Sequence, residues 1–251
     1  MVFYTGDPHG DVAEIVKFCR QMRLQPADTL VILGDVGANY YLNKRDIYVK
    51  EQLDACGPTV LCIHGNHECR PAHVPGYGLQ DWSGGQVYAQ PEYPHVLFAV
   101  DGEVYTLEGR DHLVIGGAYS VDKYYRQARH LTWYKDEQLN EKEMELGRKL
   151  CRNEAPFDLV LSHTCPYLYE PTDLFLAGLD QSTVDSTMER YLGEIEFNLD
   201  YKRWIFGHFH ADRLYPWADG RQMLMLFNEN VVNLDKFMNM TEKQSFKDII
   251  A

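Results

Sequence analysis

The stretch Val2-Phe3-Tyr4-Thr5-Gly6-Asp7-Pro8-His9-Gly10 passes from an apolar run into a glycine-rich loop that carries an acid and an imidazole. An apolar, β-branched and aromatic run of this kind predicts a buried strand. The segment that follows, residues 11–23, has helical spacing of its apolar residues, which are Val12, Ile15, Val16, Cys19 and Met22. A strand followed by an amphipathic helix is the repeating unit of an α/β fold.

The same pattern recurs along the chain. Further strands are predicted at residues 29–33, 59–63, 159–161 and 203–206, and further helices at residues 46–55, 135–152 and 182–199. A polar cluster directly follows each strand. The clusters are Gly6-Asp7-Pro8-His9-Gly10, Gly34-Asp35-Val36-Gly37, Gly65-Asn66-His67-Glu68, Ser162-His163 and Gly207-His208-Phe209-His210.

The position of these clusters indicates a ligand site, because the carboxyl ends of strands collect loops on a rigid frame. One cluster alone is weak, since an Asp after Gly is usually a turn and a His at a strand end is usually structural. Five in series favour a metal site. Carboxylate, imidazole and amide oxygen suit hard or borderline ions such as Mn²⁺, Fe, Zn²⁺ or Ni²⁺.

The middle of the chain is less regular. Residues 76–92 are rich in Gly, Pro and aromatics without periodicity, which predicts a long surface loop near the site. Residues 96–100, 104–107 and 113–115 predict a meander with a turn at Asp101-Gly102. Residues 214–216 and 223–227 predict a hairpin around Asp219-Gly220.

Length and composition predict a single domain over residues 1–251, with 45% hydrophobic and 24% charged residues and no apolar run near the ~20 residues that cross a membrane. The net charge of −13 argues against a partner such as duplex nucleic acid and leaves small anionic substrates open.

Six cysteines without CxxC spacing predict free thiols. A strand that starts at Val2 leaves no room for a signal peptide, so a cytoplasmic location is expected. The oligomeric state stays open.

The ordered clusters resemble the blocks GDxHG, GD, GNH, H and GHxH of the calcineurin-like metallophosphoesterase superfamily, and they extend from Gly6 to His210. The resemblance implies an α/β fold, a four-layer α-β-β-α sandwich of mixed sheets flanked by helices. It also implies two divalent metal ions, with Mn²⁺ expected first and Fe, Zn or Ni as alternatives.

Carried over position by position, the resemblance assigns the metal ligands. Those of one metal are Asp7, His9 and His210, those of the other are Asn66, His163 and His208, and Asp35 is expected to bridge both. Attack on the phosphoryl group would come from a water or hydroxide that bridges the metals. Asp35 and Asn66 are therefore expected to serve catalysis as well as metal binding.

His67 resembles the family histidine that contacts the phosphoryl group or protonates the leaving oxygen. An imidazole suits the acid role at neutral pH. Glu68 is expected either to orient His67 or to face solvent.

The second block runs Gly34-Asp35-Val36-Gly37-Ala38-Asn39, so it lacks the Asp and the phosphate-binding Arg that protein Ser/Thr phosphatases have there. The segment from Gly116 to Arg126 is similar to a GGA-x-S-[IV]-D-[KR] segment of bacterial and phage metallophosphoesterases. Arg126 and Lys123 are therefore expected to contact substrate, with Arg129 as a further candidate, and Arg126 is preferred because a guanidinium binds two phosphoryl oxygens. A solvated basic helix is the competing interpretation.

The function predicted from these residues is hydrolysis of a phosphomonoester or phosphodiester, with a small or flexible substrate. The alternatives are a nuclease acting on single-stranded nucleic acid and a non-catalytic scaffold. Tyrosines next to the motif loops would form an aromatic wall for a nucleobase, although ordinary packing explains tyrosines equally well. They are Tyr40, Tyr41, Tyr119, Tyr124, Tyr167 and Tyr169.

Overall fold

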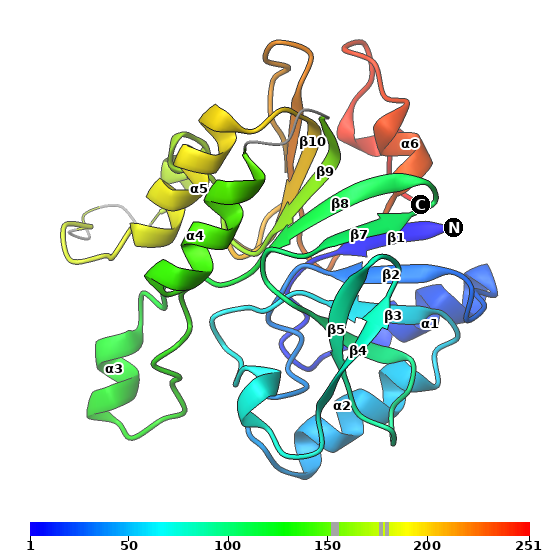
Figure 1. The fold of residues 1–251 in the computed structure, drawn as a ribbon, viewed down its shortest axis with the longest axis vertical. Coiled ribbons are helices and arrows are strands. Elements are labelled where there is room, and N and C mark those ends of the chain that lie inside the picture. Colours follow the sequence, from blue (N-terminus) through cyan, green and yellow to red (C-terminus); the bar gives the residue numbers. More distant parts are fainter. Residues whose placement is uncertain (152–155, 176–177, 179–180) are drawn as a thin grey trace.

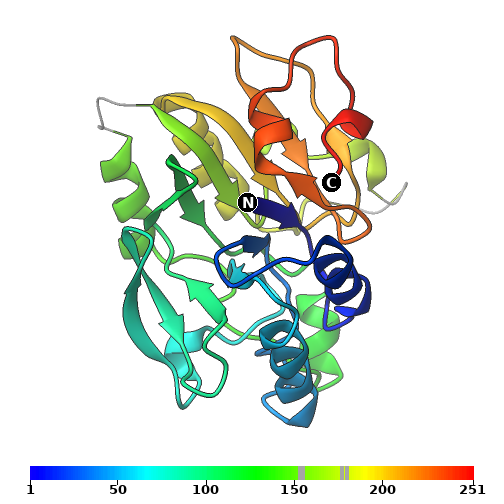
Figure 2. The same cartoon turned by 90° about the vertical axis from the view of Figure 1, so that its right-hand side faces the viewer.

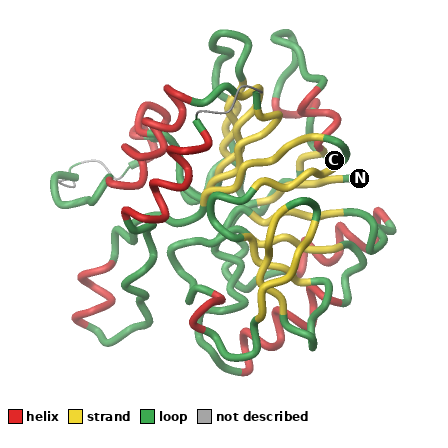
Figure 3. The backbone as a smooth tube through the Cα atoms, in the orientation of Figure 1, coloured by secondary structure: helices red, strands yellow, loops and turns green. Residues whose placement is uncertain are grey.

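A computed structural model describes residues 1–151, 156–175, 178 and 181–251, and it arranges the chain as two stacked mixed sheets with helices on their outer faces. In Figure 3 the strands occupy the centre and helices lie on either side. This arrangement confirms the predicted α/β sandwich.

The first sheet has seven strands and the second has six. In spatial order the first contains β13 (Val232–Asn233), β1 (Val2–Thr5), β2 (Thr29–Ile32), β3 (Thr59–Cys62), β6 (Val96–Ala99), β5 (Gly85–Ala89) and β4 (Gly78–Trp82). The second contains β11 (Arg213–Leu214), β12 (Gln222–Met225), β10 (Tyr201–Phe206), β9 (Phe157–Ser162), β8 (Arg110–Ile115) and β7 (Val104–Leu107). Neighbours β1, β2, β3 and β6 are parallel, as are β8, β9, β10 and β12.

Alternate residues of the inner strands belong to different cores. Val2 and Tyr4 of β1 lie in the core between the sheets, whereas Phe3 lies in the core under α1 (Ala13–Met22) and α2 (Lys44–Asp54). A third core joins the second sheet to α4 (Glu141–Leu150) and α5 (Thr187–Asn198). Because both faces of these strands are covered, their sequences are continuously apolar rather than alternating. In Figure 2 the α1 and α2 pair and the α4 and α5 pair lie on opposite sides of the strands.

The remaining helices are short. They are α3 (Lys123–Ala128), α6 (Leu234–Met238) and the 3₁₀ turns Pro71–His73, Tyr167–Tyr169, Thr172–Leu174 and Phe246–Asp248. In Figure 1, α3 projects away from the sheets.

The prediction of a long loop at residues 76–92 is wrong. These residues form the β4–β5 hairpin, which extends the edge of the first sheet. Its turn places Ser83 and Gly84 at positive φ, 48° and 95°, the geometry of a tight hairpin. Most of β4 is exposed, so no alternation of apolar residues marks it as a strand.

The predicted meander is also wrong at its first turn, because β6 and β7 belong to different sheets. Asp101 lies in the crossover between the sheets, where its carboxylate accepts bonds from Arg70 and from the backbone of Gly116. The later pair β7 and β8 is antiparallel as predicted, and so are β11 and β12.

The helix predicted at residues 135–152 begins later, at Glu141, because the side chain of Asn140 caps its first turn. Residue 152 lies outside the described residues. All six cysteines are free, as predicted. In the described part of the chain, no helix has the length and apolar character that a membrane span requires.

Candidate metal centre

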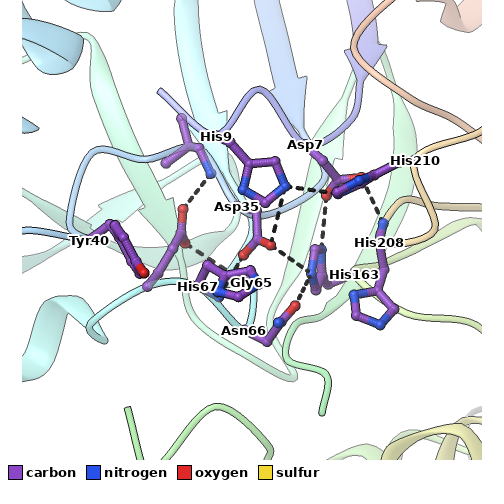
Figure 4. A network of polar contacts seen from close by, with 12 residues as sticks. Asp7, His9, Asp35, Tyr40, Gly65, Asn66, His67, His163, His208 and His210 are labelled. Atoms are coloured by element: carbon purple, nitrogen blue, oxygen red, sulfur yellow. Dashed lines mark hydrogen bonds and ion pairs between the residues drawn. The ribbon is translucent and has the colours of Figure 1, made fainter. Parts of the chain in front are cut away.

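The polar clusters meet at one place because the parallel strands of both sheets end there. Asp7 follows β1, Asp35 follows β2 and Asn66 follows β3, while His163 and His208 follow β9 and β10 of the second sheet. Figure 4 shows these side chains together with those of His9, His67 and His210. The predicted ligands are thus brought together, and their roles as ligands stay a prediction.

Asp7 joins the two sheets. Its Oδ2 accepts a hydrogen bond of 2.7 Å from the backbone N–H of His208. A Cβ at Gly207 would lie 2.7 Å from the same oxygen, so only glycine lets the carboxylate approach this backbone. The glycine of this block is therefore required by the position of the acid.

Asp35 lies at the middle of the cluster. Its Oδ1 accepts a 2.8 Å bond from the backbone of His67, and its Oδ2 lies 3.8 Å from His9 Nε2 and 3.7 Å from His163 Nε2. Ligand atoms of Asp7, Asp35 and His163 lie within 4.8 Å of one another. Asp35 thus stands between residues assigned to the two different metals.

The ring of His163 has one nitrogen committed to the backbone. Its Nδ1 lies 2.7 Å from the carbonyl oxygen of Leu33 and must donate there. The lone pair of Nε2 then faces Asn66 Oδ1 at 2.9 Å, a contact between two acceptors. A cation between these atoms removes the repulsion, and this tautomer is the one in which Nε2 binds a metal.

Two further observations fit bound cations. His9 Nε2 and His210 Nε2 lie 2.8 Å apart and both face the cluster. Asp7 Oδ1 is buried and has no hydrogen-bond partner among the described residues. The donor set of carboxylates, imidazoles and an amide oxygen therefore fits two divalent ions.

Burial governs the charge of the site. It lowers the pKa of His9 to about 4 and that of His208 well below its usual value, so both rings are neutral, as metal binding requires. Burial, followed by the charge of Asp35, raises the pKa of Asp7. Burial also acts to raise the pKa of Asp35, but His163 and its other histidine neighbours lower it overall. Bound cations favour the ionised form of both acids.

The backbone at the site is strained. His9, Asp35, His208 and His210 have φ values of 47°, 48°, 69° and 51°, in the left-handed region that side chains rarely adopt. Such strain clusters where a site must hold a fixed geometry.

A buried chain of hydrogen bonds supports Asn66. Its Nδ2 donates to Ser120 Oγ at 2.9 Å, and that hydroxyl donates to Glu137 Oε2 at 2.6 Å. Trp133 Nε1 donates to the same carboxylate oxygen at 2.6 Å. These hydrogen bonds fix which end of the Asn66 amide faces His163. Sequence reasoning missed Glu137, because no motif or periodicity marks it.

Glu68 does not orient His67 and does not face solvent, so both predictions for it are wrong. Its side chain is buried and accepts hydrogen bonds from the backbone of Val36 and of Gly65. These residues adjoin Asp35 and Asn66, so Glu68 ties two ligand loops together. Burial, followed by the charge of Asp35, raises the pKa of Glu68 to about 8.

His67 lines a cavity of about 1200 Å³ that opens from the cluster. His9, Asp35 and His210 line the same cavity, and the ring of His67 lies 5.6 Å from that of His9. This position leaves His67 accessible to a bound substrate.

Of the three predicted cations, Arg126 lines this cavity, but its guanidinium is already engaged. Nε donates to Asp122 at 2.7 and 2.8 Å, and Nη1 donates to Tyr40 Oη and to the carbonyl oxygen of Thr132. Lys123 and Arg129 do not line the cavity. Lys123 Nζ lies 4.7 Å from the ring centre of Trp133, and the Arg129 guanidinium lies 5.7 Å from that of Tyr125.

Comparisons with known proteins show what this chain is similar to. The family model described as calcineurin-like phosphoesterase matches residues 2–212. Among solved structures, TT1561 of Thermus thermophilus is similar with a TM-score of 0.53 at 13% identity, over 93% of this chain and 94% of that one. Phosphopantetheinyl hydrolase from Mycobacterium tuberculosis is also similar, with a TM-score of 0.42 at 15% identity over 91% and 90% of the two chains. A search of curated proteins finds no match.

Proposed function

The chain belongs to the calcineurin-like phosphoesterase family, and from this premise we propose that it hydrolyses a small phosphomonoester or phosphodiester with two divalent cations. The observation that carries the proposal is the lone-pair contact of His163 Nε2 with Asn66 Oδ1 at 2.9 Å beside Asp35. Acceptor atoms gather in this way where cations bind.

In the proposed centre, one ion would be held by Asp7, His9 and His210. The other would be held by Asn66, His163 and His208, and Asp35 would bind both ions. Bound there, the ions supply Lewis acidity that polarises phosphoryl oxygens and lowers the pKa of water. Mn²⁺ is the ion we propose first.

His67 is proposed to protonate the leaving oxygen or to contact the phosphoryl group. Its place on the cavity wall supports this role, and the hydrogen bond from its backbone N–H to Asp35 holds the backbone of His67 beside the centre. Arg126 is proposed to offer its remaining nitrogen, Nη2, to a phosphoryl oxygen, since Asp122 and Tyr40 already hold the rest of the guanidinium.

A panel of generic aryl phosphate monoesters and diesters, assayed with Mn²⁺, tests the proposal. We expect turnover that disappears on exhaustive chelation and returns with metal. Activity that survives chelation would refute the mechanism, and metal binding without turnover would favour a scaffold.

A further inference from the structure

The cavity continues from the candidate metal centre to a second wall that the proposed chemistry does not use. The chain segment of residues 40–49 forms this wall, through Tyr40, Tyr41, Lys44, Arg45, Tyr48 and Val49. Space lined by rings and cations next to a phosphoesterase centre is suited to the remainder of the substrate.

The rings of this wall lead away from His67 in short steps. Tyr40 lies 6.0 Å from His67 and 4.6 Å from Tyr41, ring centre to ring centre. Beyond them, the Arg45 guanidinium lies 4.8 Å from the ring centre of Tyr41. Aromatic side chains thus separate the reacting end of the cavity from a cationic end.

Hydrogen bonds hold the backbone at the start of this wall before any ligand arrives. The buried carboxylate of Asp46 accepts bonds from the backbone of Tyr41 at 3.1 Å and of Leu42 at 2.7 Å. The hydroxyl of Tyr134 donates to the carbonyl oxygen of Tyr40 at 2.7 Å. A backbone that is already ordered lowers the entropy cost of binding.

Lys44 and Arg45 are the unpaired cations of the cavity. Within the part of the chain that the structure describes, neither side chain forms an ion pair or a hydrogen bond with an acid, whereas Arg126 is paired with Asp122. Two adjacent unpaired cations stand out on a chain of net charge −13. They attract an anion that the protein itself does not supply.

We propose that this wall binds the organic half of a phosphoester that carries a planar ring and a second anionic group, the chemistry of a nucleotide with two separate phosphates. The ring would lie against Tyr41 and the second anion against Lys44 and Arg45, while the first phosphate is at the centre. This proposal rests on the proposed function in one respect only, that the group at the metal centre is a phosphate ester. Binding of the ring and of the second anion does not depend on it.

Binding without turnover tests the wall directly. Calorimetry on chelator-treated protein compares adenosine 5′-monophosphate with adenosine and with ribose 5-phosphate. We expect the monophosphate to bind about 10-fold to 100-fold more tightly than either, as charge-assisted bonds and stacking of a base predict.

Variants separate the two contributions. Combined Lys44→Ala and Arg45→Ala should remove the advantage over adenosine, and Tyr41→Leu should remove the advantage over ribose 5-phosphate. Combined Lys142→Ala and Lys149→Ala on α4 changes the charge equally and should leave binding unchanged. Equal affinity for the three ligands, or full affinity in the Lys44 and Arg45 variant, would overturn the proposal.

Turnover with Mn²⁺ gives a second readout. The ratio of kcat/KM for adenosine 3′,5′-bisphosphate to that for the monophosphate should be about 10 or more and fall to about one without Lys44 and Arg45. If a single-stranded oligonucleotide binds more tightly than the mononucleotides, the substrate is nucleic acid and the proposal of a small substrate is wrong. If no ester is hydrolysed, the proposed function fails, while the binding comparison still decides the role of the wall.

Discussion

Replacing Ser120 by alanine should weaken metal binding more than it weakens the fold. The hydroxyl is the sole described link between the Asn66 amide and Glu137, and Asn66, Ser120 and Glu137 are all buried. Ser120→Ala leaves the Asn66 N–H without its acceptor, which costs about 1–3 kcal/mol of folding stability. Glu137 keeps its bond from Trp133, so the second loss is smaller.

The larger effect concerns the orientation of the amide. Without Ser120, nothing holds Oδ1 toward His163 in the metal-free protein, and the NH₂ can turn to donate to the lone pair of His163 Nε2. Metal binding must then first turn the amide back. Loss of a residue that orients a metal ligand costs about 10–100-fold in metal affinity or activity. We therefore expect that range for the weaker-bound ion of Ser120→Ala, measured by competition with a chromophoric chelator alongside thermal unfolding.

Thr59→Ala is the matched control. Its hydroxyl donates to the carbonyl oxygen of Pro26 at 3.0 Å, at the amino end of β3 and thus at the end of the strand opposite the centre. It should lose some stability and no metal affinity. If Ser120→Ala binds metal within about twofold of the wild type while its stability falls, the hydroxyl is structural only and the reasoning is refuted.

Four further outcomes are expected. Asp35→Asn should abolish activity and reduce metal content from two ions to at most one by elemental analysis, and a wild-type content of one ion would contradict the binuclear centre. His67→Ala should keep its metals and lose about 10²–10⁴-fold in rate, most for poor leaving groups, whereas equal loss for all esters would argue against an acid role. Arg126→Lys should lower kcat/KM nearly as much as Arg126→Ala, because lysine cannot hold Asp122 and Tyr40 together, and a change within about twofold (~0.5 kcal/mol) would mark a surface residue. Burial raises the pKa of Glu189 to about 7 from 4.5, so the folded state binds a proton that the unfolded state releases, and stability falls as the pH rises through that interval. Glu189→Gln keeps the acceptor for Thr164. Its free energy of unfolding should match that of the wild type near pH 4.5 and exceed it by up to about 3 kcal/mol at pH 8. A difference that does not change with pH would exclude Glu189 as the cause.

The parts predicted correctly are those that local pattern determines. The strands before Asp7, Asp35 and Asn66 are short apolar runs with a glycine just before the polar residue, and parallel strands place their carboxyl ends at one edge. The position of the cluster therefore follows from sequence, even though its residues come from distant parts of the chain.

The parts missed depend on which distant segments pair. No sequence pattern within residues 96–107 indicates that β6 joins one sheet and β7 the other, because both runs are apolar. The exposed strand β4 has no periodicity to detect. Likewise, adjacency in sequence predicts a contact of Glu68 with His67, but the carboxyl of Glu68 reaches the backbone of Val36 across the fold.

The bond between the backbone of His208 and the carboxylate of Asp7 spans 201 residues, which bears on how the protein is made. A chain growing on the ribosome has Asp7 long before it has β10, so the first sheet carries unsatisfied acids until the second arrives. Closing so long a loop is slow, because the chain loses conformational entropy before the contact forms. Uptake of the proposed ions would then mark the end of folding, and ions that bind only the completed site would stabilise the docked sheets by mass action.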